Sequence, residues 1–388
     1  MAEFQIIPKY IIGKEFIVDL VQQLRIYKIK KIYLILQNIQ NNNKFLKKFK
    51  DLCDYYEIAY HEEKIEFLSI DENKFNYYLD CIKKGLPEAF IVFGGEIAIN
   101  IAKLFNYLIP NKKIKSLDDF INNLNLNIEF PLKLFCILNE FTLGSENNFP
   151  GVLKIQYQNQ TNRYIFNANS MPAYIFSDDE LFKDLNIHQI NINIYAMLIR
   201  SMEQYLYKNN FEWTKNYILG NIQTLIDIIN TKEIKTSDKI ANILWTNLCI
   251  NNGMSNLLNV GDWKIHILAY ELSDYFDINL NDAILLIAIK YFKIRNEIDE
   301  NFKQLLNNFC LQLLGNNKNC SVISFLSDII TKLNLDEKYK ELNEYSFFNE
   351  KEKLNIIKNN AINKILLIDN SMNKNQLDEI ISILLKLN

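Results

Sequence analysis

Short apolar runs alternate with amphipathic stretches in the first half of the chain. The runs are rich in β-branched and aromatic residues, as buried strands are, and they occur at residues 31–36, 90–93 and 134–138. The stretches between them, such as residues 44–57 and 74–84, have the spacing of helices. Short apolar strands that alternate with helices predict a parallel sheet with helical crossovers. We therefore expect an α/β domain over residues 1–180.

The second half of the chain has the pattern of long helices. All six prolines lie between Pro8 and Pro172, so no proline interrupts the residues that follow. Apolar positions recur at helical spacing in segments such as 194–207, 282–293 and 375–387. The apolar stripe of the last segment is typical of a core or dimer contact. We expect an all-helical domain over residues 181–388.

Composition and charge narrow the class of protein. The 388 residues are 49% hydrophobic and carry a formal net charge of -3, so they provide no basic excess for binding nucleic acid or a membrane surface. No apolar run is long enough to cross a bilayer, and the start, MAEFQIIPKY, lacks the features of a signal peptide. The six cysteines are widely spaced and are expected to be reduced. The expected location is the cytoplasm.

A strand that ends in two glycines and leads into a helix is a geometry that binds phosphate. The strand at residues 90–93 has this ending, and a second polar loop follows the strand at 134–138. The first pattern is weak alone, because tight strand-to-helix turns also need small residues. The family resemblance described next implies these candidate cofactor contacts in and after the two loops: Gly94, Gly95, Asn100, Lys103, Thr142, Gly144 and Ser145.

The order of these segments resembles the iron-containing alcohol dehydrogenases, which are relatives of dehydroquinate synthase. That family carries GGGSxxDxAK, PTTxGTGSE and P…DPxL in turn, followed by DAxxHxxExY and HxxxH…HG on helices. Here the third segment is Met171-Pro172 with Asp178, which is also a plausible helix N-cap. The resemblance covers roughly residues 5–290. It implies a Rossmann-like dinucleotide-binding domain, a helical domain, an active site between them, NAD(P) as the candidate cofactor and a homodimer or larger homo-oligomer.

The resemblance also implies four metal ligands, an aspartate and three histidines. At these positions the chain has Ala196, Arg200, His266 and Leu280. Alanine and leucine have no lone pair to donate, and the permanent charge of arginine repels a divalent ion. The alignment places His188 outside the helix that carries the ligands, so it does not replace them. We expect no bound catalytic metal.

The nucleotide loops have changed as well. The family's third glycine is Glu96 here, its aspartate is Asn100, and its threonine pair is Asn139-Glu140. Two carboxylates near the expected position of a pyrophosphate disfavour that ligand through like-charge repulsion.

Two hypotheses of function follow from these substitutions. The one that we favour is a pseudoenzyme that keeps the fold and serves as a ligand-binding or scaffolding subunit. The alternative is a metal-independent NAD(P)-dependent oxidoreductase that acts on a small alcohol, aldehyde or sugar derivative, with Arg200 stabilising the developing alkoxide and Tyr270 donating the proton. His266 is then either a catalytic residue or a satisfied core histidine. A dehydroquinate synthase-like lyase is a third hypothesis, and it too normally needs the metal.

Overall fold

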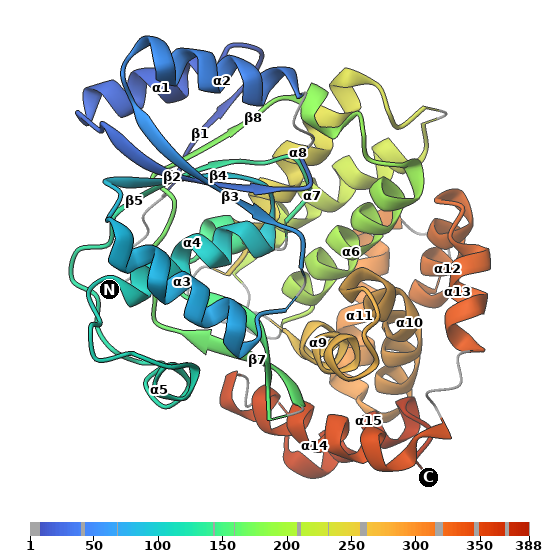
Figure 1. Ribbon diagram of the computed structural model, residues 1–388. Helices are drawn as coiled ribbons and strands as arrows, with labels where there is room; N and C mark the ends of the chain where they lie inside the picture. Colours follow the sequence, from blue (N-terminus) through green and yellow to red (C-terminus); the bar gives the residue numbers. More distant parts are fainter. Residues whose placement is uncertain are drawn as a thin grey trace. The chain divides into compact units, whose positions relative to one another are not determined.

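The computed structural model describes residues 8–39, 43–67, 69–142, 144–158, 160–207, 211–231, 233–256, 262–314, 321–344, 349–368 and 372–387 (Figure 1). The described chain divides into two compact units. The first ends at Asp184 and is α/β, and the second begins at Leu185 and is helical.

A six-stranded parallel sheet forms the centre of the α/β unit, in the strand order β1-β8-β5-β4-β2-β3. Its strands are β1 (Lys9–Ile12), β2 (Lys31–Gln37), β3 (Ala59–Ile65), β4 (Ala89–Phe93), β5 (Lys133–Ile137) and β8 (Tyr174–Ser177). The three apolar runs of the sequence are the inner strands β2, β4 and β5, as predicted. The edge strands β1 and β3 are half-exposed and carry polar residues, so the sequence pattern did not reveal them.

Helices cover both faces of this sheet (Figure 1). One face carries α1 (Phe16–Ile26) and α2 (Lys44–Tyr55), and the other carries α3 (Glu72–Lys84) and α4 (Glu96–Leu108). Helix α4 is buried from Ala98 to Leu108, and the buried residues include the polar Asn100, Lys103 and Asn106. The unit also contains α5 (Leu117–Ile121), the antiparallel hairpin β6 (Gly151–Tyr157) and β7 (Gln160–Phe166), and the 3₁₀ helices η1 (Ser145–Asn147) and η2 (Asp179–Phe182).

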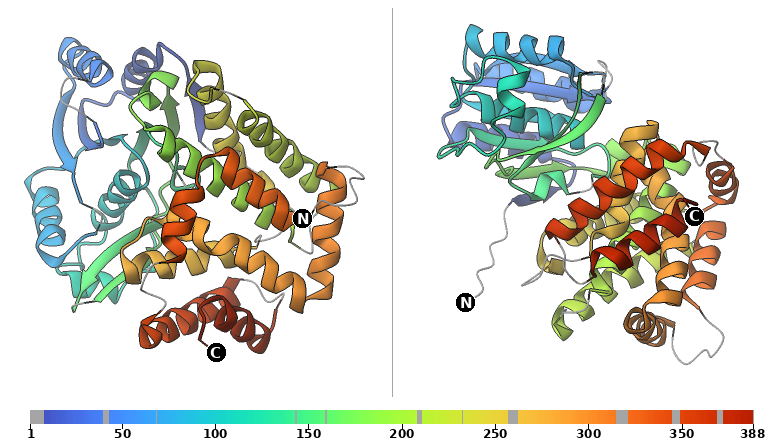
Figure 2. Two further views of the ribbon diagram at one scale, coloured as in Figure 1. Left: turned by 90° about the vertical axis from the view of Figure 1, so that its right-hand side faces the viewer. Right: turned by 90° about the horizontal axis from the view of Figure 1, so that it is seen from below.

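The helical unit is built around α10 (Leu280–Ile298), whose residues Ala283–Ile289 are all buried. Its other helices are α6 (Ile187–Tyr205), α7 (Glu212–Ile229), α8 (Ser237–Asn251), η3 (Met254–Asn256), α9 (Lys264–Phe276), α11 (Glu300–Leu314), α12 (Val322–Lys332), α13 (Asp336–Asn343), α14 (Lys351–Ile368) and α15 (Lys374–Leu384). The last two lie side by side in Figure 2, in the red part of the chain. Helix α14 also packs on α9, and α15 packs on α10. The apolar stripe of α15 is therefore part of the core of this unit.

One sequence interpretation was wrong. Helix α6 begins at Ile187, where Asn186 and Gln189 form a capping box, so His188 lies on the same helix as Ala196 and Arg200. It is exposed in the first turn, roughly 18 Å along the helix axis from Arg200. His188 therefore cannot act beside Arg200 because of this separation, although it lies on the same helix.

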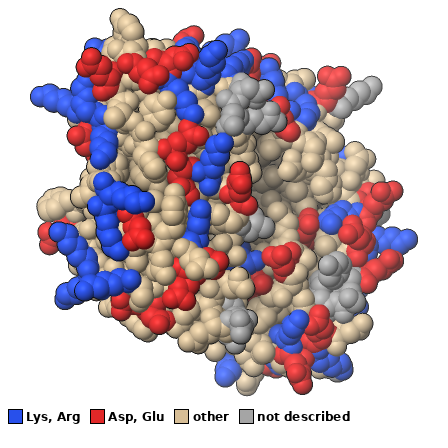
Figure 3. Space-filling model, in the orientation of Figure 1, with Lys and Arg blue, Asp and Glu red and all other residues tan. Residues whose placement is uncertain are grey.

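The distribution of charge on the surface is consistent with the low net charge of the chain. On the face drawn in Figure 3, acidic and basic side chains of the described residues are interspersed and form no continuous basic tract of the kind that binds nucleic acid. Within the described ranges, every helix is too short or too polar to span a membrane.

Candidate functional site

The glycine turn after β4 lies at the carboxyl edge of the sheet. Gly94 continues the strand pairing, since its N–H donates to the carbonyl of Ile137 at 3.0 Å. Gly95 is the N-cap of α4, so the first N–H groups of that helix face the edge where a parallel sheet binds ligands. The side chain of Gln37 takes up some of them, because its Oε1 accepts from the N–H of Ala98 at 3.0 Å and of Gly95 at 3.4 Å.

The carboxylate of Glu140 lies directly against Gly95. A methyl group at Gly95 would lie 1.7 Å from Oε1 of Glu140. Oε2 accepts from Nδ2 of Asn38 at 3.0 Å, and the backbone of Glu96 also donates to this carboxylate. Burial raises the pKa of Glu140, and the nearby charge of Glu96 adds to that rise. The protein's own carboxylate therefore fills the cradle in which a phosphate would accept the same hydrogen bonds.

Asn100 and Lys103 have structural partners. Nδ2 of Asn100 donates to the carbonyl of Glu96, and its Oδ1 accepts from the N–H of Val152 at 3.0 Å. The fully buried Nζ of Lys103 donates to carbonyl oxygens of Ser145, Asn148 and Pro150 and to Oδ1 of Asn148, at 2.6–2.9 Å. Burial lowers the pKa of Lys103 to about 7. Both side chains thus hold the 142–152 segment against α4.

The second predicted loop is folded around a buried acid. Oγ1 of Thr142 donates to Glu146 at 2.5 Å, and burial raises the pKa of Glu146. Gly144 has a φ of 101°, a left-handed conformation that favours glycine. The hydroxyl of Ser145 is buried without a hydrogen-bond partner among the described residues. The seven cofactor candidates therefore lie in the glycine turn, in the helix α4 that follows it and in the second loop, and three of them, Asn100, Lys103 and Thr142, use their side chains within the protein.

In the helical unit, Arg200 lies on α6 one turn after Ala196 and is buried. Its Nη1 donates to the carbonyl of Asp262 at 3.0 Å and lies 3.9 Å from a carboxylate oxygen of Glu203. The guanidinium carbon is 3.3 Å from the centre of the Trp263 ring, a stacked cation–π contact. Burial lowers the pKa of Arg200 to about 10, so the side chain remains charged at neutral pH.

Glu203 joins α6 to the start of α9. One carboxylate oxygen accepts from the N–H of Ile265 at 2.7 Å, and the other is hydrogen-bonded to Nδ1 of His266. Both Glu203 and His266 are buried. The retained Glu203 thus fixes the ring of His266.

A second acid, Asp262, balances further cations. It pairs with Nη1 of Arg295 on α10 at 2.8 Å and with Nζ of Lys264 at 3.3 Å. Burial alone would raise the pKa of Asp262, but Lys264 and Arg295 outweigh it and lower the pKa to about 2. The result is a buried ionic network of three cations (Arg200, Lys264 and Arg295) and two acids (Glu203 and Asp262).

Asp262 makes the stability of the protein depend on pH in the acid range. Its folded-state pKa lies below the ordinary 3.8, so its contribution is complete above that value and is lost as pH falls through about 2. The difference corresponds to about 2 kcal/mol. We expect Asp262→Asn to lower the free energy of unfolding in urea at neutral pH, and the gap from wild type to narrow as the acid range is entered. A gap that stays constant down to pH about 2 would contradict the assignment.

The four positions that correspond to metal ligands do not fit a divalent ion. Ala196 and Leu280 provide no donor atom, and the guanidinium of Arg200 puts a positive charge beside His266. His266 alone keeps a possible ligand atom, its Nε2, because Nδ1 is hydrogen-bonded to Glu203. Among the described residues, no group of three His, Cys, Asp or Glu side chains is arranged to hold a metal.

Two buried nitrogen atoms of the residues that contact Glu203 have no hydrogen-bond partner within the described ranges. They are Nη2 of Arg200 and Nε2 of His266. Tyr270 follows His266 by one turn on α9, and its charge would interact with Arg200. Arg200 and His266 thus both lie against Glu203. Nη2 of Arg200 can donate to an oxygen atom, whereas Nε2 of His266 is the acceptor nitrogen of a ring whose Nδ1–H donates to Glu203.

The sequence interpretation missed Gln37, Asp262, Trp263, Lys264 and Arg295. One signal was present in the composition. The chain uses lysine for nearly all of its basic residues, yet the only arginines after residue 163 are Arg200 and Arg295, on apolar helices. Arginine suits buried ion pairs and ring stacking better than lysine does, so these two positions could have been identified as a pair.

The α/β unit with its six-stranded parallel sheet, together with the helical unit, gives the chain the fold of the iron-containing alcohol dehydrogenases and related aldehyde reductases. Similar solved structures include NADH-dependent butanol dehydrogenase A of Thermotoga maritima, with a TM-score of 0.79, 17% identity and 98% of each chain covered.

Two others are an iron-containing alcohol dehydrogenase of Thermococcus thioreducens (TM-score 0.77, 11% identity) and a sulfoacetaldehyde reductase of Bifidobacterium kashiwanohense in complex with NAD+ (TM-score 0.77, 12% identity), each with 100% of both chains covered. No protein-family model and no curated protein sequence matches the chain. The resemblance noted in the sequence is confirmed at the level of the fold.

Proposed function

We propose that this protein is a pseudoenzyme, which keeps the iron-containing alcohol dehydrogenase fold as a ligand-binding or scaffolding subunit and transfers no hydride. The observation that carries the proposal is the position of Glu140. Its carboxylate accepts hydrogen bonds at the first turn of α4 and covers Gly95. A pyrophosphate would have to displace this carboxylate and would meet the charge of Glu96 beside it. Without the nicotinamide cofactor there is no hydride donor.

The Arg200 cluster supports the same proposal. A guanidinium that is stacked on Trp263 and bonded to the carbonyl of Asp262 replaces a metal ligand by a structural ion-pair network. Both regions of the fold that would serve catalysis are thus held by the protein's own charged side chains. We propose a homodimer or larger homo-oligomer in the cytoplasm as the working form.

The test is thermal unfolding of the purified protein with NAD+, NADH, NADP+ and NADPH. We expect no rise in Tm for the wild type, because the cradle is filled. Glu140→Ala empties the space above Gly95 and frees the N–H of Glu96, so it is expected to gain a response to nucleotide. A ligand at ten times its Kd stabilises by about 1.4 kcal/mol, or roughly 3–5 °C for a unit of this size.

Glu129→Ala is the matched control, because it removes one carboxylate from an exposed position of the same unit. It should behave as the wild type does. A wild-type Tm that rises with NADH as much as that of Glu140→Ala would sink the proposal.

The alternative, a metal-independent NAD(P)-dependent oxidoreductase, is favoured by one observation. The buried Nη2 of Arg200, which has no hydrogen-bond partner within the described ranges, could donate to a carbonyl oxygen near Tyr270. It predicts oxidation of NADH or NADPH by a small aldehyde, with the loss of that activity in Tyr270→Phe. The pseudoenzyme predicts no turnover in either protein.

A further inference from the structure

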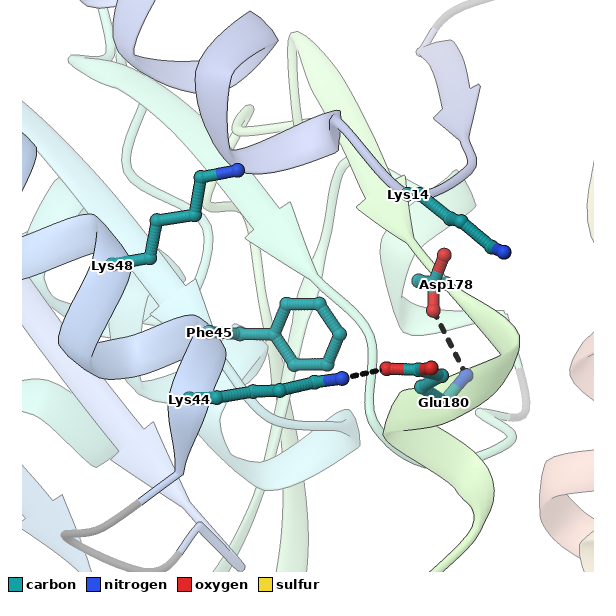
Figure 4. Close-up of a pocket in the computed structure, with 6 residues that line it drawn as sticks. All are labelled: Lys14, Lys44, Phe45, Lys48, Asp178 and Glu180. Atoms are coloured by element: carbon teal, nitrogen blue, oxygen red, sulfur yellow. Dashed lines mark hydrogen bonds and ion pairs between the residues drawn. The ribbon is translucent and has the colours of Figure 1, made fainter.

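A pocket of about 280 Å³ lies at the carboxyl end of the sheet, beside the first turns of α2 (Figure 4). Lys14 follows β1, and Asp178 and Glu180 follow β8. Lys44, Phe45 and Lys48 come from α2. The pocket shares no lining residue with the glycine cradle, so its ligand would be independent of the proposed loss of dehydrogenase chemistry.

Asp178 is the feature of this pocket that calls for a ligand. Its side chain is 1% exposed, and its Oδ1 accepts from the N–H of Glu180 at 3.0 Å, as predicted for an N-cap. Its Oδ2 is buried and has no hydrogen-bond partner among the described residues. In Figure 4 this oxygen points to the side on which Lys14 lies. A buried carboxylate oxygen without a donor is costly, because nothing replaces the water that it lost.

The three lysines of the pocket differ in whether an acid is paired with them. Lys44 is paired with Glu180, and Lys48 lies 3.1 Å from Glu15. No acid among the described residues, Asp178 included, forms an ion pair with Lys14. One cation and one carboxylate of the pocket are therefore unpaired.

We propose that this pocket binds a free α-amino acid. The ammonium group donates to Oδ2 of Asp178, and the carboxylate accepts from Lys14. The ring of Phe45, which Figure 4 shows on the floor of the pocket between Lys48 and Lys44, supplies an apolar surface for the side chain.

Charge balance favours this ligand over a phosphate. A phosphate dianion would meet one unpaired cation and would lie close to two carboxylates, Asp178 and Glu180. A zwitterion neutralises Asp178 and Lys14 separately and adds no net charge. The volume of the pocket suits a ligand of this size.

The experiment is thermal unfolding of the full chain with each of the standard amino acids at millimolar concentration, followed by calorimetric titration of the one that raises Tm most. The N-acetylated and the amide derivatives of that amino acid lack the ammonium and the carboxylate in turn. We expect both derivatives to bind at least about tenfold more weakly, since each loses a charge-assisted hydrogen bond.

Two variants test the residues. Asp178→Asn keeps the oxygen that caps η2 and replaces the unpartnered one, and Lys14→Met alters an exposed side chain. Each should weaken amino-acid binding by about tenfold or more, while Lys47→Met, an exposed lysine of α2 outside the pocket, should not. If no amino acid raises Tm, or if only inorganic phosphate does so in a manner that depends on Lys14, the proposal is wrong.

Discussion

Replacing Arg200 by alanine is expected to lower the free energy of unfolding by about 3–5 kcal/mol, the usual cost of removing one partner from a buried ionic network. The change leaves Glu203 with less positive charge nearby and removes the donor to the carbonyl of Asp262. It also opens a gap beside Trp263, where the guanidinium is stacked. Urea unfolding followed by circular dichroism would measure the loss.

Two further variants separate charge from geometry. Arg200→Lys keeps the charge but cannot both stack on Trp263 and reach the carbonyl, so an intermediate loss is expected. Lys351→Ala removes an exposed positive charge from the same unit and should change the stability by less than about 0.5 kcal/mol. A loss for Arg200→Ala no larger than that of Lys351→Ala would show that Arg200 does not stabilise the helical unit.

In the α/β unit, Lys103→Met is expected to be equally damaging. Methionine has a similar length, but it leaves the carbonyl groups of Ser145, Asn148 and Pro150 without their donor. Since each buried polar group left unpaired costs roughly 1–3 kcal/mol, we expect a total loss of at least about 3 kcal/mol.

Hydrogen exchange locates this second effect. The amide of Asn147, which donates to the carbonyl of Gly144, and that of Val152, which donates to Asn100, should exchange faster in Lys103→Met. The exposed Lys113→Met is the control and should leave both amides protected as in the wild type. Unchanged exchange in Lys103→Met would mean that Lys103 contributes nothing to the order of this loop.

On the proposed function, two regions of the molecule would explain how a dehydrogenase-like fold persists without its reactants. At the start of α4, Gln37 and Glu140 accept the hydrogen bonds that a phosphate would accept. At the start of α9, Arg200 provides a fixed positive charge, which Glu203 and Asp262 balance. On the proposed function, a charged side chain of the protein takes the place of the ligand in each case.

The proposed amino-acid pocket is the opposite case. Oδ2 of Asp178 has no hydrogen-bond partner among the described residues, and no described acid forms an ion pair with Lys14. A protein with closed catalytic regions and one open, charge-complementary pocket would act as a ligand-responsive subunit, which is consistent with the pseudoenzyme proposal.

The sequence by itself determined the architecture of both units. The inner strands β2, β4 and β5 could be predicted from the sequence because strands buried on both faces are apolar along most of their length. The helical unit could be predicted because no proline, which would break a helix, occurs after residue 172. The absence of a donor atom at positions 196 and 280 could also be predicted from the sequence, since the identity of a side chain is a local property.

Only the tertiary structure decided what the replacement residues do. Glu140 covers Gly95 across 45 positions of sequence, and Arg200 meets Trp263 across 63. Buried strands and helices can be predicted from the pattern of residues in short segments. An ion pair, or a carboxylate that fills a ligand site, depends on the distance between segments that the fold brings together. The same physical reason explains why Asp178 could be recognised from the sequence as an N-cap, through its hydrogen bond two residues away, but not as an unpaired charge beside Lys14.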